Sequence, residues 1–158
     1  MKRIYKYKIL LLISSLFFFS HTEFAQYGQK EIDLPFVKNF TSKEYKAHGQ
    51  NFAIAQDDRG LIYSANFSGI LEYDGAVWRT IPTSLRSKAT AIAKDKNGRL
   101  FVGARNEFGY LSVNKTNGSL YYVNISNKLK KNDRDFTEII SVFATNSGII
   151  FVSEKAVY

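Results

Sequence analysis

Hydrophobic residues come in short runs along most of this chain, and small polar clusters that contain glycine separate the runs. Runs of about five β-branched, aromatic and aliphatic residues between Gly, Asp and Asn are typical of strands joined by tight turns. No amphipathic helical period alternates with them, which argues against a solenoid. The pattern predicts an all-β fold, with strands near 52–56, 61–65, 69–73, 77–81, 89–94, 99–104, 108–113, 119–124, 138–144 and 149–153.

The hydrophobic runs occur in pairs joined by a short polar turn, and this paired unit repeats along the chain. One copy covers 53–63, a second covers 91–103, and a third covers 141–152 after a polar insertion. Between its two hydrophobic runs, each copy has Asp or Thr, then two polar residues, then Gly. This order is typical of a tight turn, because an Asp side chain caps the turn and Gly accepts a positive φ. A second hairpin with Asp-Gly or Asn-Gly at its turn follows in the first two copies. The predicted structural turn residues are Asp57, Gly60, Asp74, Gly75, Asp95, Gly98, Asn117, Gly118 and Gly148.

Four short antiparallel strands that recur about every 40 residues are typical of β-propeller blades. A sandwich does not repeat its turn chemistry at a fixed offset. We assign a lead-in segment to 26–50, a first blade to 51–84, a second to 85–126, and a connector with a truncated third blade to 127–158. Propellers have about four to eight blades, so we expect an incomplete propeller and hence a fragment of a larger protein. A small free-standing β-sheet protein is the alternative.

Residues 1–25 have the pattern of a secretory signal peptide. Residues 1–8 are short and cationic, and 9–19 are almost wholly apolar. This arrangement is typical of such signals, whereas a membrane span needs about 20 apolar residues. We expect cleavage after Ala25, although Glu23 fits poorly at the third position before that bond. A retained N-terminal anchor is the alternative, and either interpretation places the rest of the chain outside the cytoplasm.

Composition narrows the class of protein. The net charge is +8 and cysteine is absent, which removes disulfides, thiol catalysis and zinc sites built on cysteine. Lys2, Arg3, Lys6 and Lys8 against Glu23 give the first 25 residues +3, so the remainder carries +5. Its cations are scattered, many in turns beside Asp or Asn, whereas a nucleic-acid face needs them clustered. We expect no nucleic-acid partner through this segment.

Several segments together resemble the two-component-regulator propeller sensors, which are extracytoplasmic ligand-binding domains of bacterial signalling proteins. Roughly residues 35 to 158 take part in this resemblance, and it depends on a combination of individually weak motifs. The lead-in resembles the segment before the first blade of those sensors, and the last residues resemble a later blade. The segments that carry the resemblance are 39–45, 50–57, 59–63, 69–75, 78–79, 148–151 and 153–158.

The resemblance implies a modular receptor on the periplasmic side of the inner membrane. Such proteins continue with more blades, a β-sandwich domain named for three tyrosines, and a membrane helix or helical linker. A cytoplasmic histidine kinase, helix-turn-helix regulator, cyclase or phosphatase follows. The implied partners are an unknown small-molecule or glycan ligand and the downstream domains. Any enzymatic output would lie downstream of this chain, which we expect to be non-catalytic.

The residues themselves indicate no catalytic, cofactor-binding or metal-binding set, and no cofactor is expected. His21 falls in the signal peptide, which leaves His48 alone in a polar stretch. A His-rich metal site needs further histidines, and a Ser-His-Asp triad needs a serine that the sequence does not place beside this histidine. Asp57-Asp58 and Asp133-Arg134-Asp135 could suggest a calcium site, but turn formation explains the first pair and a solvated loop the second. We expect Trp78 to pack between blades.

Two other functions remain open at this point. A secreted propeller hydrolase or lyase acting on polysaccharide would carry clustered carboxylates or histidines downstream and no membrane segment. A surface structural or adhesion propeller would carry a C-terminal sorting or anchoring domain. The sequence does not identify the ligand, the number of blades or the output domain.

Overall fold

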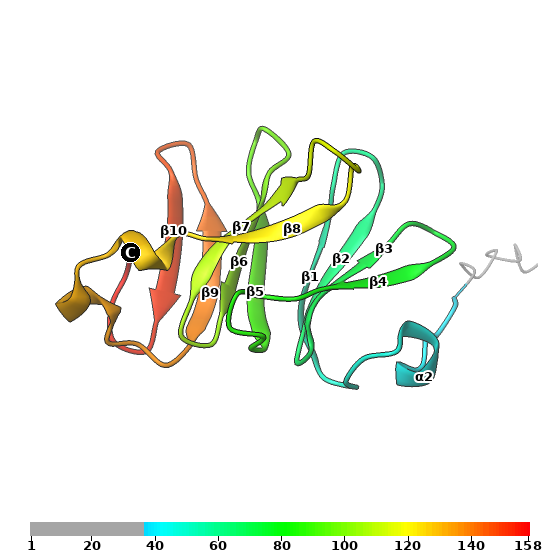
Figure 1. The fold of residues 1–158 in the computed structure, drawn as a ribbon, viewed down its shortest axis with the longest axis horizontal. Helices are drawn as coiled ribbons and strands as arrows, with labels where there is room; N and C mark the ends of the chain where they lie inside the picture. The colour runs from blue at the N-terminus through cyan, green and yellow to red at the C-terminus, as the bar shows by residue number, and fades with distance from the viewer. Residues whose placement is uncertain (1–36) are drawn as a thin grey trace, which may run out of the picture. The chain divides into compact units, whose positions relative to one another are not determined.

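The computed structural model describes residues 37–158. The chain divides into two units, Met1–Lys38 and Asn39–Tyr158, and the fold described here is that of the second (Figure 1). The predicted signal peptide, 1–25, and the first part of the predicted lead-in lie outside the described residues.

Two four-stranded sheets and one two-stranded sheet make up the fold, and every pairing within them is antiparallel. The first sheet contains, in chain order, β1 (Asn51–Gln56), β2 (Ile62–Asn66), β3 (Gly69–Tyr73) and β4 (Trp78–Ile81). The second contains β5 (Ala89–Lys94), β6 (Leu100–Ala104), β7 (Phe108–Val113) and β8 (Leu120–Asn124). The third contains β9 (Ile139–Ala144) and β10 (Ile149–Ser153). The prediction of an all-β fold with four-stranded antiparallel units is confirmed, and each strand bound lies within one residue of its predicted place.

Three short helical turns were not predicted. They are α2 (Ser42–Tyr45), η1 (Ser126–Lys128) and η2 (Lys131–Arg134). The backbone N–H of Thr41 donates to the Glu44 carboxylate at 2.6 Å, which fixes the start of α2. One turn is too short to produce a helical period in the sequence, so these elements gave no signal.

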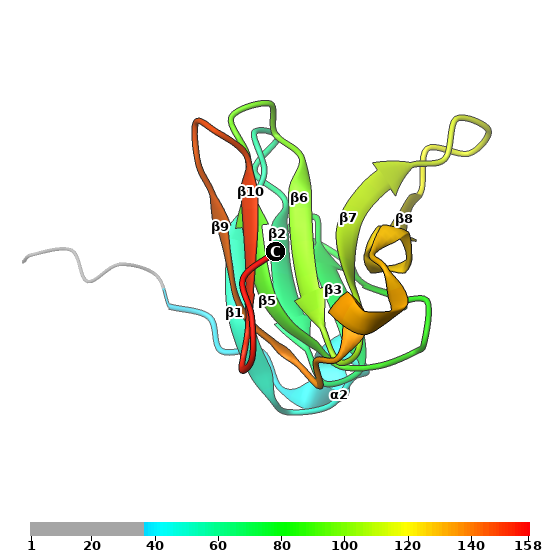
Figure 2. The same ribbon diagram turned by 90° about the vertical axis from the view of Figure 1, so that its left-hand side faces the viewer.

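The three sheets pack in a row through their first strands. Strand β5 contacts β1 on one side and β9 on the other. Figure 2 looks along this row, with β1 and β9 at one edge of the fold and β8 at the opposite edge. The Thr90 hydroxyl on β5 donates to the Ile139 carbonyl on β9 at 2.6 Å, so a buried hydrogen bond joins the second sheet to the third.

Two hydrophobic clusters fill the spaces between the sheets. The first cluster joins the first two sheets and is built around Tyr63, Ile70, Val102 and Tyr122. The second joins the second and third sheets, and its aromatic part is Phe101, Phe108, Phe136 and Phe151. Burial of apolar area contributes about 25 cal/mol per Å², so these clusters hold the sheets side by side.

An aromatic cluster attaches the lead-in to the outer strands of the first sheet. Trp78 stacks on Tyr73 with ring centroids 4.6 Å apart. Phe40 meets both rings edge-on, and Tyr45 of α2 lies 5.6 Å from Trp78. The expectation that Trp78 packs between blades is therefore wrong: its ring contacts within residues 37–158 are with its own sheet and the lead-in.

Candidate functional site

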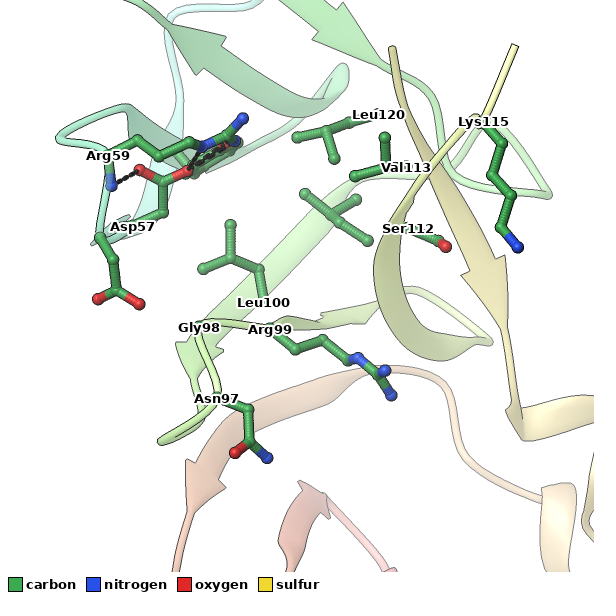
Figure 3. Close-up of a pocket in the computed structure, with 13 residues that line it drawn as sticks. Asp57, Arg59, Asn97, Gly98, Arg99, Leu100, Ser112, Val113, Lys115 and Leu120 are labelled. Carbon is green, nitrogen blue, oxygen red and sulfur yellow. Dashed lines mark hydrogen bonds and ion pairs between the residues drawn. The ribbon is translucent and has the colours of Figure 1, made fainter. Parts of the chain in front are cut away.

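An open cavity of about 510 Å³ lies between the first and second sheets, where their hairpin turns meet (Figure 3). The β1–β2 turn supplies one wall, the β5–β6 turn another, and the β7–β8 hairpin the third. Its floor is aliphatic, and its rim carries most of the charged groups. The lining residues are Asp57, Asp58, Arg59, Tyr63, Asn97, Gly98, Arg99, Leu100, Leu111, Ser112, Val113, Lys115 and Leu120.

The first wall is organised by Asp57, one of the predicted turn residues. One carboxylate oxygen accepts the backbone N–H groups of Arg59 and Leu61 at 2.9 and 3.0 Å. The other accepts the guanidinium of Arg59 at 2.7 Å and the hydroxyl of Tyr63 at 3.1 Å. Gly60 takes a φ of 87° in the same turn, a conformation that glycine adopts without strain.

Asp57 and Tyr63, two of the three ionisable groups in this network, have pKa values shifted from their ordinary ones. Burial alone would raise the pKa of Asp57, but hydrogen bonds from Arg59, from two backbone N–H groups and from Tyr63 outweigh it and hold the pKa below its ordinary value. Burial raises the pKa of Tyr63 to about 12, with help from the negative charges of Asp57 and Glu72. At neutral pH this wall therefore presents an ionised Asp57 paired with Arg59 and a neutral tyrosine.

The second wall repeats the same turn chemistry. The Asp95 carboxylate accepts the backbone N–H groups of Asn97 and Arg99 at 2.9 and 2.8 Å. Gly98 has a φ of 79°. The Arg99 guanidinium then lies over the ring of Tyr110, 4.9 Å from its centroid, in a cation–π contact that restricts the side chain.

The two walls are linked by an ion pair between Asp58 of the first turn and Lys94 at the end of β5. Asp58 also lies close to Gly98, where an added methyl group would come within 2.7 Å of a carboxylate oxygen. The turns of the first two sheets are therefore in contact, and Gly98 permits their close approach.

The third wall is the β7–β8 hairpin, which carries Lys115. The Asn117 side chain accepts the backbone N–H of Ser119 at 3.0 Å, and Gly118 has a φ of 73°. This is the predicted Asn-Gly turn. It places Lys115 at the rim of the cavity, beside the exposed side chain of Val113.

A second hollow, also of about 510 Å³, shares Arg59 and Leu120 with the cavity and continues along the outer strands of the first sheet. Arg79 lies there, held by Glu72 and by Asp74 at 2.6 Å. Asp74 accepts the backbone N–H groups of Val77 and Ala76, and these bonds, with Arg79, keep its pKa below the ordinary value. The Gly75 φ of 94° completes this predicted turn.

The remaining candidates from the sequence lie away from the cavity. The Nδ1 of His48 accepts the backbone N–H of Gln50 at 3.1 Å, and its ring packs on Phe67. Asp135 pairs with Lys155 at 2.8 Å. Gly148, with a φ of 151°, lies in the β9–β10 turn. Among residues 37–158 there is no group of three His, Cys, Asp or Glu side chains placed to hold a metal ion.

The sequence does not show that several charged side chains line one cavity. Arg59, Arg99 and Lys115 were treated as part of a scattered, solvated charge, because the sequence does not show that three separate turns meet. It also missed Glu107, which is fully buried and accepts the backbone N–H of Leu85 and the side-chain amide of Asn124. No local motif identifies such a carboxylate.

The chain was also compared with known proteins. No family model matches it, and no curated protein matches it. The extracellular domain assigned to a hybrid two-component system from B. thetaiotaomicron is similar in structure, with a TM-score of 0.55 and 20% sequence identity. The match covers 77% of this chain and 17% of that one. This chain has the fold of part of that extracellular domain. Within residues 37–158, no helix is long and apolar enough to cross a membrane.

Proposed function

We propose that this chain forms part of an extracytoplasmic, ligand-sensing β-propeller in a bacterial signal-transduction receptor. The observation that carries the proposal is the row of tandem antiparallel sheets packed through their first strands. Successive four-stranded sheets in this arrangement are typical of propeller blades. The similarity to an extracellular domain assigned to a two-component system favours a sensor among the functions that propellers perform.

Exposed apolar side chains on the first strands of the outer two sheets support the proposal that further blades pack against this part of the protein. Ile54 of β1 is 72% exposed, and Phe143 of β9 is 54% exposed. Both strands would line the centre of a ring, and their free faces lie at opposite ends of the row. Further sheets of the same receptor, packed as β1 packs on β5, would cover them.

The chain itself is proposed to bind and not to catalyse. The carboxylates that line the cavity, Asp57 and Asp58, are held in ion pairs with Arg59 and Lys94, which favours a structural role for both over proton transfer. The proposed ligand is a small molecule or glycan. Its binding on the periplasmic side of the inner membrane would change how the propeller packs on the next domain and thereby change the cytoplasmic output.

Sequencing the gene beyond the codon for Tyr158 tests this proposal. We expect the reading frame to continue into further four-stranded repeats, a membrane helix and a kinase or transcriptional regulator. Clustered carboxylates or histidines without a membrane segment would instead indicate a polysaccharide hydrolase or lyase, and an anchoring domain would indicate an adhesion protein. A stop codon followed by an unrelated gene would also contradict the proposal that this chain is part of a receptor.

A further inference from the structure

We propose that the buried carboxylate of Glu107 is a latch that couples the two connections of the second sheet. One connection is the linker 82–88, which enters from the first sheet, and the other begins at 124–128 and leads toward the third sheet. The two connections are held together or released together. This inference goes beyond the proposed function, because it concerns how the second sheet is joined to its neighbours whether or not the chain belongs to a receptor.

The entering linker depends on Glu107 for its shape. One carboxylate oxygen accepts the backbone N–H of Leu85 at 2.9 Å and the hydroxyl of Ser87 at 3.3 Å. Ser87 also donates its backbone N–H to the Thr83 hydroxyl at 2.8 Å. Arg86, between Leu85 and Ser87, has a φ of 51°, a left-handed conformation that costs free energy for a residue other than glycine. The hydrogen bonds on either side of Arg86 offset that cost.

The exit from the second sheet is bound by the other oxygen of the same carboxylate. This oxygen accepts the side-chain N–H of Asn124, the last residue of β8, at 2.9 Å. The side-chain oxygen of Asn124 accepts the Ser126 hydroxyl at 2.8 Å and the backbone N–H of Asn127 at 3.4 Å. Glu107 therefore reaches the first turn of η1 through one intervening side chain.

Burial makes the two sides interdependent. Glu107 is fully buried, and it forms no ion pair within residues 37–158. A buried carboxylate without a cation depends on hydrogen-bond donors to offset the loss of its hydration. The linker and Asn124 supply these donors. If the linker moves away, water reaches the carboxylate and competes for its bonds, which weakens the hold on Asn124, and release of Asn124 weakens the hold on the linker.

The third sheet offers a comparison within the same molecule. There the carboxylate of Glu154 accepts the backbone N–H groups of Thr137 and Glu138 at 2.6 and 3.3 Å. Both groups belong to the segment that enters β9, and Glu154 itself is exposed. Glu154 therefore anchors one segment at the surface, whereas Glu107 joins two segments in the interior.

The test perturbs one side of the latch and measures the other side, by NMR hydrogen exchange of backbone amides in the full chain. Ser126→Ala, on the exit side, should speed exchange of the Leu85 amide about twofold or more, the lower range of couplings measured within one hydrogen-bond network. Ser87→Ala, in the linker, should have an effect of similar size on the Asn127 amide. A cross-effect smaller than this in both variants would overturn the inference.

Removing the latch should remove both cross-effects. Gln presents an N–H group where one carboxylate oxygen now accepts one, so in a Glu107→Gln background the two serine substitutions should no longer act across the sheet. Asn124→Ala breaks the same link on the exit side, which keeps the test valid if Glu107→Gln does not fold. Cross-effects of full size in these backgrounds would show that the coupling does not pass through Glu107.

Glu154→Gln is the matched control. It should speed exchange of the Thr137 amide and leave the Leu85 and Asn127 amides at their wild-type rates. The amide of Val102, a fully buried residue of β6, reports opening of the whole fold. It should keep its rate in both serine variants, and an equal acceleration at Val102 would indicate general destabilisation and refute the latch.

Discussion

Gly103 of β6 lies against Ile139 of β9 at such short range that a methyl group on its Cα would come within 2.3 Å of the Ile139 Cγ2 atom. Ile139 is fully buried. The missing side chain therefore sets the distance between the second and third sheets, and hydrogen is the largest substituent that fits at this position. The Thr90 hydroxyl, which donates to the Ile139 carbonyl, fixes the same contact from β5.

Gly103→Ala should lower the free energy of unfolding by about 1–3 kcal/mol, the usual cost of overpacking a core. The third sheet must move away from the second to accept the methyl group. Urea unfolding, followed by circular dichroism, measures the change. Gly49→Ala is the control, because nothing lies within 4 Å of the position of its added methyl group. Equal stability of the two variants would show that the sheets do not pack at this distance.

Asp57→Asn should remove a pH-dependent part of the stability. The folded pKa of Asp57 lies below its ordinary value of 3.8, so its ionised form stabilises the fold above that pH and the contribution is lost as pH falls through the folded pKa. We expect the variant to be about 2 kcal/mol less stable at pH 7. The difference should shrink below about pH 4, as urea unfolding at several pH values will show. Asp133→Asn, at an exposed position in η2, should leave the curve unchanged.

Tyr63→Phe should alter stability at the other end of the pH range. The folded pKa of Tyr63 is raised from 10.0 to about 12, so its contribution is present below pH 10 and is lost as pH rises toward the folded pKa. The wild type should lose stability over that interval, and the variant should lose less. Tyr121→Phe is the control because Tyr121 is 47% exposed. A wild-type curve that is flat over that interval would refute the buried network of Asp57 and Tyr63.

Phe40→Ala should detach part of the lead-in from the first sheet. The phenyl ring meets Tyr73 and Trp78 edge-on at 4.9 and 5.3 Å, and such contacts contribute about 0.5–1.5 kcal/mol each beyond area burial. Trp78 is the single tryptophan of the chain, so its fluorescence should shift to longer wavelength as water reaches the indole. Phe143→Ala, at a 54% exposed position on β9, should leave the emission unchanged. An unshifted emission in Phe40→Ala would mean that the lead-in does not cover Trp78.

The sequence predicted the strands and turns well because each depends on local chemistry. The turn at Asp57 forms through bonds that span two to four residues, so its residues carry the whole signal. The same is true of the Asp95 turn and the Asn-Gly turn of the β7–β8 hairpin. Repetition of that chemistry at similar spacing then indicated repeated sheets.

Features that depend on distant segments could not be predicted. The cavity requires turns near residues 58, 98 and 115 to meet, and the packing of Trp78 requires Phe40 from the lead-in. The buried carboxylate of Glu107 accepts the backbone N–H of Leu85, which lies 22 residues earlier in the chain. These contacts depend on how the sheets are arranged in space, so they cannot be predicted from the spacing of residues along the chain or from its composition.

The most direct test of the sensing account uses the protein encoded by the whole locus, in its own cells. Residues 51–158 are deleted in frame, and expression of the target genes is measured with and without a ligand that the intact protein binds. The account predicts that the deletion abolishes the response to that ligand while the shortened protein still accumulates. An unchanged response to the ligand would contradict it.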